Sequence, residues 1–215
     1  ISLFEKQLVA IGRALVRPDV SVVLLDEPLT AVEPGIKWRL RQTLKQVQDE
    51  LGVTMIYVTH DQTEALTFAE RVSVLADGQI LQTGTPEAVY QNPAHQFVGR
   101  FLGSPGMNFL PLRAFPQPLR RRFAEAGDPE TIGFRPESAR LTAPSDDLLS
   151  GIVETQRILG TAQGRVVSMY GLRCGDEQVF VRSALSFECG DEVGIALQHR
   201  VGFRQALRVG SNGAE

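Results

Sequence analysis

Two carboxylates and an imidazole follow directly after two apolar runs of the sequence. Asp26 and Glu27 come after VVLL (22–25), and His60 comes after IYVT (56–59). Successive residues of a strand point to opposite faces, so Asp26 and Glu27 would present one carboxylate to each side of a strand's carboxyl end. One carboxylate can hold Mg²⁺, directly or through water, while the other polarises a nucleophilic water. An imidazole at the same sheet edge can contact a phosphate.

Each of these residues also has a plainer interpretation. Asp26 and Glu27 could simply cap a loop, and His60 could be a solvated turn residue. Their arrival at the ends of two consecutive strands favours phosphate chemistry over these alternatives, because ligands of open α/β sheets bind at the carboxyl ends of the strands.

The surrounding pattern predicts the elements that would position these groups. Short apolar runs at 21–28 and 53–60 are typical of strands, and helical periodicity covers about 5–17, 36–51 and 62–70, with Gly52 as a helix stop. Strands that are apolar on both faces and alternate with helices predict a buried parallel sheet, hence an α/β fold.

A second kind of pattern follows. Asp77-Gly78 between two β-rich runs predicts a hairpin over 71–84, Thr85-Pro86 predicts a helix start, and a further helix is expected over 94–102. Prolines and glycines cluster at 103–118, which places a domain boundary after residue 103. Short β-rich runs between 131 and 208 then predict an all-β domain, a small barrel or sandwich of the OB type. The two expected domains are residues 1–103 and 104–215.

Composition narrows the classes of function. The chain has 215 residues, 43% of them hydrophobic, and a net charge of −3, which fits a globular protein and gives no electrostatic case for nucleic acid. LRRRF (119–123) is expected to be a solvated face or loop, not a nucleic-acid patch. Cys174 and Cys189 have no metal-ligand spacing and are expected to be reduced thiols. We expect no membrane span, because the apolar runs are only a few residues long, and no secretion signal, because the sequence shows no charged-then-apolar leader.

Two longer stretches carry a family resemblance. VVLLDEPLTAVEP (22–34) and IYVTHDQTEALTFAERVSVLADGQILQTGTPEAVYQNP (56–93) closely resemble ATP-binding subunits of ABC transporters, and the likeness covers about residues 1–103. The resemblance implies that Asp26 of the Walker B strand serves Mg²⁺, that Glu27 is the general base for water attack, and that His60 senses the γ-phosphate of ATP. It places Glu33 in the D-loop at a dimer interface, where the family normally has Asp.

The opening run, ISLFE (1–5), has two interpretations. Ser2 and Glu5 have the spacing of a capping box, which explains a helix start. In the family the loop before this helix is L-S-G-G-Q, which contacts the nucleotide bound by the opposite subunit. Only Ser2 matches, so the resemblance leaves Ser2 as the one nucleotide-binding residue of an altered signature.

The second half is similar to the C-terminal, OB-like (TOBE-type) regulatory domain of importer ATPases of the maltose and glycerol-phosphate type. The resemblance rests on FLGSPGMNFLPL (101–112) and IGFRPESARL (132–141). It implies a bacterial importer of sugars or glycerol-phosphate, with regulatory contacts and dimer-holding contacts in this domain.

One part of the ATPase machinery is missing from the sequence. We find no G-x-x-x-x-G-K-[ST] loop, the Walker A motif whose backbone N–H groups and Lys cradle the phosphates. The family order predicts that a sizeable N-terminal portion precedes the sequence, and we expect these 215 residues alone to be inactive.

For the full-length protein the resemblance implies an ATPase that uses ATP and Mg²⁺. Its expected partners are transmembrane permease subunits, a periplasmic or lipid-anchored solute-binding protein and a second copy of itself, at the cytoplasmic face of the cell membrane. The alternative is a non-catalytic regulatory or interaction protein descended from such an ATPase. The altered signature and D-loop favour the alternative, whereas intact Asp26, Glu27 and His60 oppose it.

Overall fold

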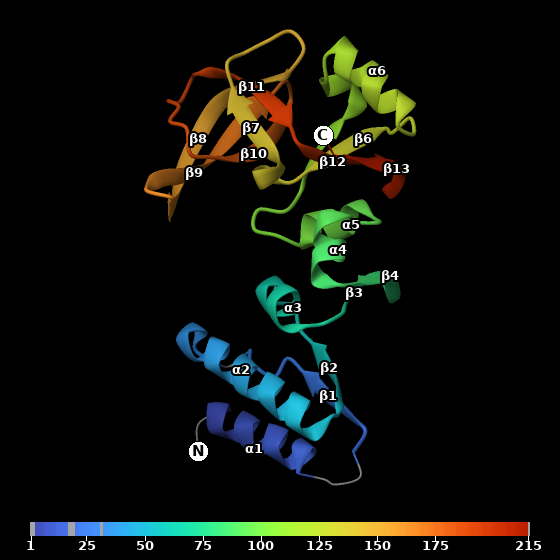
Figure 1. Cartoon of the computed structure of the whole chain (residues 1–215), viewed down its shortest axis with the longest axis vertical. Helices are drawn as coiled ribbons and strands as arrows, with labels where there is room; N and C mark the ends of the chain where they lie inside the picture. Colours follow the sequence, from blue (N-terminus) through green and yellow to red (C-terminus); the bar gives the residue numbers. More distant parts are fainter. Residues whose placement is uncertain (1–2, 17–19, 31, 215) are drawn as a thin grey trace. The chain divides into compact units, whose positions relative to one another are not determined.

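The chain forms two compact units that divide after Glu70. The structure, a computed structural model, describes residues 3–16, 20–30 and 32–214 (Figure 1). The expected boundary between family domains at 103 and 104 is a different kind of division and stays a prediction. No helix within the described ranges is both long and apolar enough to cross a membrane.

The first unit alternates helices and strands, as predicted. Its elements are α1 (Leu3–Leu15), β1 (Val22–Asp26), α2 (Pro34–Leu51), β2 (Thr54–Val58) and α3 (Gln62–Phe68). Gly52 ends α2 as expected: its φ is 63°, a left-handed conformation that glycine adopts without steric cost, and its N–H donates to Gln48 O at 2.9 Å. The capping box of α1 cannot be compared, since Ser2 lies outside the described residues.

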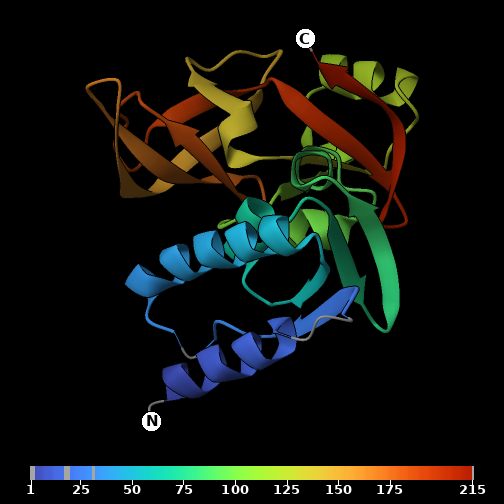
Figure 2. The same ribbon diagram turned by 60° about the horizontal axis from the view of Figure 1, so that its bottom comes forward.

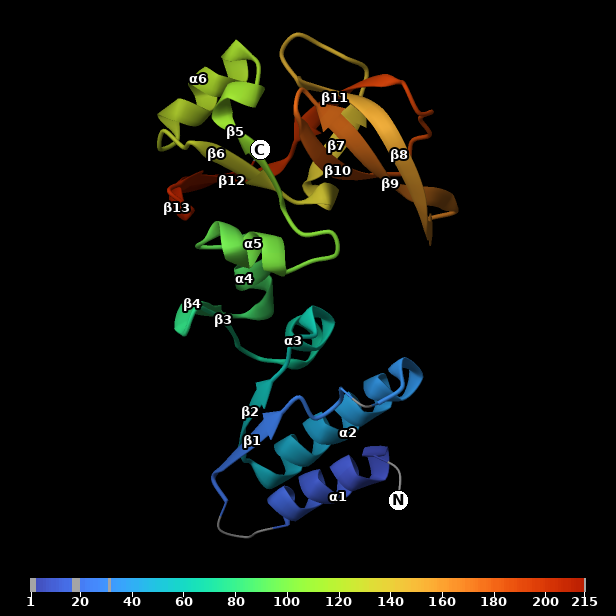
Figure 3. The same ribbon diagram turned by 180° about the vertical axis from the view of Figure 1, so that it is seen from behind.

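The two strands β1 and β2 pair in parallel, as the alternating pattern predicts, with Val22 opposite Thr54 and Asp26 opposite Val58. One face of this pair is covered. Val23 and Leu25 pack there with Ile11 of α1 and Leu44 of α2, so both helices serve the same face (Figure 3).

The expectation of a sheet buried on both faces is wrong for the other side. Leu24 is 71% exposed, and Val22, Ile56 and Val58 are between 47% and 49% exposed. The physical reason is that all the apolar packing of the two strands within this unit goes to one face, whereas parallel sheets are normally covered on both. The strands therefore keep the all-apolar sequence of a buried sheet while showing one apolar face.

The second unit begins with the predicted hairpin, β3 (Val72–Ala76) and β4 (Gln79–Gly84) (Figure 2). Asp77 and Gly78 both have positive φ, 49° and 75°, as the tight type I′ turn requires. Thr85 caps α4 (Pro86–Gln91) by accepting a hydrogen bond from the Ala88 N–H, and α5 (Gln96–Phe101) follows. Both helix predictions are confirmed.

The rest of this unit is β-rich (Figure 3). One sheet has the strand order β10-β9-β8-β11-β7 and the other the order β13-β12-β6-β5. The five-stranded sheet consists of β7 (Ala139–Thr142), β8 (Leu149–Ala162), β9 (Arg165–Cys174), β10 (Glu177–Ser183) and β11 (Glu192–Leu197). The four-stranded sheet consists of β5 (Asn108–Pro111), β6 (Thr131–Phe134), β12 (His199–Arg204) and β13 (Leu207–Ala214). Two single 3₁₀ turns, η1 (Leu112–Ala114) and η2 (Pro136–Ser138), lie in the connections. These sheets are as expected, although one helix also lies within residues 104–215, and the narrower OB-like assignment stays a prediction.

The segment LRRRF, expected to be a solvated face or loop, lies in a helix, α6 (Gln117–Glu125), that the sequence pattern did not predict. Its three arginines are exposed, as expected of a solvated face, but Phe123 is only 2% exposed and packs edge-to-face on Phe115 at 5.2 Å between ring centroids. One aromatic anchor in an otherwise charged stretch is a weak periodic signal, which explains the missed helix.

One fully buried guanidinium joins the helical segment of this unit to its β-rich part. Arg135 donates to the backbone carbonyls of Tyr90, Gly99 and Leu102, and its guanidinium carbon lies 3.9 Å from the Tyr90 ring centroid. These contacts explain why residues 71–102 belong to the same compact unit as the strands that follow.

Candidate functional site

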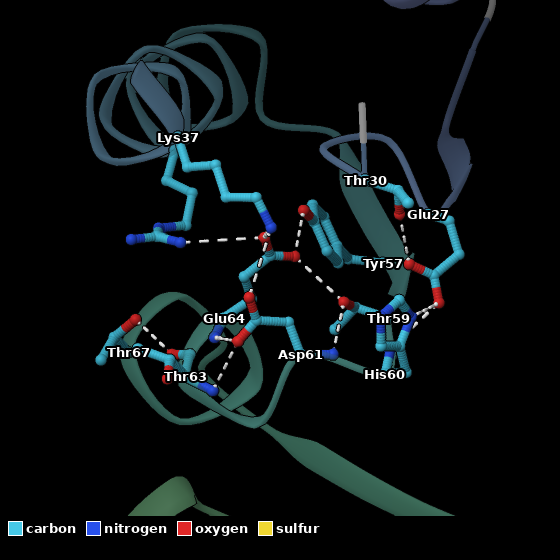
Figure 4. Close-up of polar contacts among 11 residues, drawn as sticks. Glu27, Thr30, Lys37, Tyr57, Thr59, His60, Asp61, Thr63, Glu64 and Thr67 are labelled. Carbon is cyan, nitrogen blue, oxygen red and sulfur yellow. Dashed lines mark hydrogen bonds and ion pairs between the residues drawn. The ribbon is translucent and has the colours of Figure 1, made fainter. Parts of the chain in front are cut away.

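The parallel register of β1 and β2 brings the predicted site residues to one edge. Asp26 is opposite Val58, and the N–H of Glu27 donates to Val58 O at 2.9 Å, which extends the ladder one residue beyond the strand. The backbone then leaves the sheet at the carboxyl end of each strand, with Glu27 after β1 and His60 after β2, and the two side chains lie next to each other (Figure 4).

Glu27 is held by three hydrogen bonds. Its Oε1 accepts from the backbone N–H of His60 at 3.0 Å and lies 2.6 Å from His60 Nδ1, and its Oε2 accepts from the Thr30 hydroxyl at 2.7 Å (Figure 4). The backbone of Glu27 has φ 47°, in the left-handed region that non-glycine residues seldom adopt. Such strain collects at functional sites, so this conformation is an independent reason to look for a function here.

The contact between Glu27 and His60 shifts both protonation equilibria. The hydrogen bond from His60 is the main cause that lowers the pKa of Glu27, and the Thr30 hydroxyl adds to it. The same bond, with the charge of Glu27 behind it, raises the pKa of His60. The His60 side chain is 74% exposed, so its second ring nitrogen, Nε2, can still meet a ligand from solvent.

Behind His60 lies a buried carboxylate that sequence reasoning missed. Glu64, on α3, has a side chain only 3% exposed. Its Oε1 lies 3.2 Å from Lys37 Nζ and 3.8 Å from an Arg41 nitrogen, both on α2. Its Oε2 accepts from the hydroxyls of Tyr57 at 2.8 Å and Thr59 at 3.0 Å (Figure 4).

A signal for this cluster was present in the sequence. Lys37 and Arg41 stand one helical turn apart on a helix whose apolar stripe includes Leu40 and Leu44. Two cations next to the buried stripe of a helix point to a buried acid, but only the tertiary structure identifies Glu64 as that acid.

Asp26 is exposed at the end of β1. Within the described part of the chain there is no group of three or more His, Cys, Asp or Glu side chains able to hold a metal ion together. Mg²⁺ in phosphate sites is commonly held by one or two carboxylates with waters and substrate phosphates completing its shell. A single accessible carboxylate beside Glu27 fits that mode of binding and does not fit a cage built from protein alone.

The other two predicted site residues are not brought into this cluster. Glu33 is the exposed N-cap residue of α2, and its side chain makes no capping hydrogen bond. Ser2 lies outside the described residues. Their roles at a dimer interface and toward nucleotide therefore stay predictions.

Comparison with known proteins gives the family. No family model matches the chain. It is 38% identical over 205 residues to an sn-glycerol-3-phosphate import ATP-binding protein of Vibrio vulnificus, and the aligned region covers 89% of this chain and 54% of that protein. It is 38% identical over 175 residues to the maltose/maltodextrin import ATP-binding protein of Escherichia coli, 73% of this chain and 47% of that protein. The trehalose/maltose import ATP-binding protein of Thermococcus litoralis is 37% identical over 180 residues.

The chain thus spans about half the length of the curated relatives it matches. The identities extend beyond the first 103 residues, since a 205-residue match takes in most of the β-rich unit as well. The chain belongs to the family of ATP-binding subunits of ABC importers for sugars and glycerol-phosphate.

Proposed function

We propose that this chain is part of the ATP-hydrolysing subunit of a bacterial importer for sugars or glycerol-phosphate. The observation that carries the proposal is the meeting of Glu27 and His60, 2.6 Å apart, beside Asp26 at the carboxyl edge of a parallel sheet. That edge is where α/β proteins bind their ligands.

The three residues have separate roles in this proposal. Asp26 holds the Mg²⁺ of the bound nucleotide, directly or through water, and the ion supplies charge stabilisation at the phosphates. Glu27 orients and polarises the attacking water. His60 donates from Nε2 to the γ-phosphate while Nδ1 stays on Glu27, because a protonated imidazole has a donor on each nitrogen.

Glu27 keeps room for a water despite its hydrogen bonds. A carboxylate has about four lone-pair positions, and the two bonds from His60 and one from Thr30 use three of them. The fourth, on Oε2, can accept from water, and the side chain is 36% exposed. Its lowered pKa makes it a weak proton acceptor in this state, so we assign it water orientation ahead of proton removal.

The site needs a phosphate-binding loop that these 215 residues do not contain. We therefore propose that the chain by itself does not turn over ATP. The exposed apolar face of β1 and β2 supports this proposal, and we assign that face to contact with the portion of the subunit that carries the loop.

The wider assignment follows the relatives' names, which describe import ATP-binding proteins. We propose permease subunits and a solute-binding protein as partners, a homodimer of the ATPase, and a position at the cytoplasmic face of the membrane. In the β-rich unit we propose the regulatory, OB-like (TOBE-type) domain, with the family boundary at 103 and 104.

The rival function is a non-catalytic regulatory protein derived from such an ATPase. Two observations favour it: Glu33 replaces the usual D-loop Asp, and ISLFE replaces most of the signature loop. The rival predicts that completing the nucleotide site would not restore hydrolysis.

One experiment separates the two. The chain is purified alone and also joined to the loop-bearing portion of the Vibrio vulnificus relative, and phosphate release from Mg-ATP is measured for both. The proposal expects no turnover by the chain alone and multiple turnovers by the joined protein. Turnover by the chain alone would overturn the expected inactivity. A folded, nucleotide-binding but inactive joined protein would favour the rival.

A further inference from the structure

His60 is exposed, yet the residues on both sides of it are fixed. Thr59 donates its hydroxyl to Glu64 Oε2 at 3.0 Å and accepts from the Asp61 N–H, also at 3.0 Å. Asp61 in turn caps α3 by accepting from the N–H groups of Thr63 and Glu64. The 59–61 loop is therefore tied down through hydrogen bonds that do not involve the imidazole.

The anchor of this loop is the carboxylate of Glu64. It is nearly inaccessible to water, and it is paired with Lys37, which also lies 3.3 Å from Asp61 Oδ2. Lys37 and Arg41 balance the charges of Glu64 and Asp61, which makes burial of the carboxylate tolerable. Tyr57 donates to the same Oε2 from β2, and burial is the main cause that raises its pKa. Tyr57 therefore stays protonated and keeps this donor.

Resting on the proposed function, we propose that Glu64 is a positioning residue for His60: through the Thr59 hydroxyl it fixes the 59–61 loop on α2 and β2, so that His60 meets Glu27. The bond from Thr59 is the shortest connection between Glu64 and this loop. The two contacts of His60 with Glu27, from its backbone N–H and from Nδ1, are the geometry that this arrangement sets.

The same carboxylate reaches the segment on the other side of the site. Lys37 lies in the first turns of α2, which begins directly after the 28–33 segment that carries Thr30 and Glu33. Glu64 thus connects the helix after that segment with the loop that carries His60. A change at either place alters the hydrogen bonds of one buried carboxylate, whose partners come from α2, from β2 and from the loop after β2 (Figure 4).

The test reads the His60–Glu27 contact directly in the 215-residue chain, without nucleotide. Amide hydrogen exchange at His60 is measured by NMR, because its N–H donates to Glu27 Oε1. Thr59→Val removes the hydroxyl and keeps the volume. Glu27→Ala gives the reference level, the protection of a His60 amide that has lost its acceptor. Thr59→Ser restores a hydroxyl. Thr67→Val is the matched control: Thr67 lies on α3 with Glu64, and its hydroxyl donates to the Thr63 carbonyl.

We expect Thr59→Val to lower the His60 protection about five- to tenfold, the effect of one net hydrogen bond, to the level of Glu27→Ala. Thr59→Ser and Thr67→Val should keep the protection of the parent chain. Protection of the β2 amides reports whether the unit is folded. If Thr59 had only a structural role, Thr59→Val would lower the protection of these amides together with that of His60. If Thr59→Val does not fold, Thr59→Ala takes its place with the same criteria.

Parent-like protection at His60 in the folded Thr59 variant would overturn the proposal. This measurement does not depend on catalysis, so the positioning proposal can fail while the ATPase proposal holds. In the joined protein a second measurement applies: Thr59→Val should lower kcat about tenfold with the KM for ATP little changed, and Thr59→Ser should recover it. If kcat is parent-like while the His60 contact is lost, the positioning has no catalytic consequence and the proposal is overturned at that step.

Discussion

His60 Nδ1 lies 2.6 Å from Glu27 Oε1, although 33 positions separate the two residues in the chain. The contact exists because β1 and β2 run parallel and in register, so that Glu27, directly after β1, and His60, two residues after β2, emerge at the same edge. Both side chains are accessible to solvent, which distinguishes this pair from the buried Glu64 cluster beside it.

The first prediction concerns the charge state of this pair. Glu27→Gln should lower the pKa of His60 from its raised position toward the ordinary histidine range, because the carboxylate is the main cause of the shift. Asp61 also raises the pKa of His60 and Lys37 lowers it, so these two effects oppose each other and the direction of the predicted change stays the same. NMR titration of the His60 ring measures this, with Glu50→Gln as the exposed control. An unchanged His60 pKa in Glu27→Gln would contradict the assigned contact.

The same pair sets a pH window for its contribution to stability. The raised pKa of His60 means that its contribution is fully present below pH 6.5 and is lost as the pH rises through the folded-state pKa. The lowered pKa of Glu27 means that its contribution is present above 4.5 and is lost as the pH falls through the folded-state value. Urea midpoints of the parent chain and Glu27→Gln should therefore differ most between about pH 5 and 6 and converge on either side. A difference that grows steadily toward alkaline pH would contradict this assignment.

Catalysis should depend on Glu27 in the joined protein. Glu27→Gln should slow ATP hydrolysis by about 10²-fold or more, the effect of misplacing a reacting group, while nucleotide binding is retained. Phosphate release and equilibrium nucleotide binding measure the two effects. Glu50→Gln, an exposed glutamate on α2 bonded to Gln46, should leave both unchanged. Full activity of Glu27→Gln would remove Glu27 from the mechanism.

The buried Glu64 cluster should matter for the stability of the first unit. Glu64→Ala leaves Lys37 without its closest partner in a largely buried position, and breaking such a pair costs about 3 kcal/mol. Urea unfolding followed by the fluorescence of Trp38 and by NMR amide signals of β2 measures the loss. Glu70→Ala removes a carboxylate that is 75% exposed and paired with Lys45, and should cost less than about 1 kcal/mol. Equal losses in the two variants would show that burial does not distinguish these pairs.

The uncovered face of β1 should tolerate charge only in the chain alone. Leu24→Lys places an ammonium at a position that is 71% exposed, so the isolated chain should keep its stability within about 0.5 kcal/mol. In the joined protein the same change should impair folding or hydrolysis, since we assign this face to the loop-bearing portion. Leu25→Lys is the matched control, because Leu25 is 6% exposed and the change should unfold both forms. A fully active joined Leu24→Lys protein would contradict the assignment of this face.

Arg135 gives a prediction for the second unit. Arg135→Ala leaves the carbonyls of Tyr90, Gly99 and Leu102 without their donor in a buried place, which we expect to cost about 3 kcal/mol or more. Arg135→Lys should not rescue it, because an ammonium cannot reproduce the planar fork that spans three carbonyls. Arg173→Ala, which breaks an exposed pair with Glu154, is the control. Thermal unfolding measures all three, and a parent-like Arg135→Lys would contradict the geometric argument.

Local features of the fold could be predicted from the sequence. Hydrophobic periodicity predicted the helices and strands of the first unit, Gly52 and Asp77-Gly78 predicted a helix end and a tight turn, and the apolar runs predicted parallel pairing. These features depend on the backbone conformation and side-chain spacing of a few neighbouring residues, so the local sequence is enough to predict them. The likeness to importer ATPases was also readable from sequence alone.

Which side chains contact one another could not be predicted in this way. The pairing of Glu27 with His60 needs the register of two strands, and the Glu64 cluster needs α2, α3 and β2 to converge. The bare face of the sheet was mispredicted for the same reason: apolar residues show that a strand tends to be buried, not what covers it. Burial and long-range hydrogen bonds depend on distances between segments remote in the chain, and no local pattern encodes those distances.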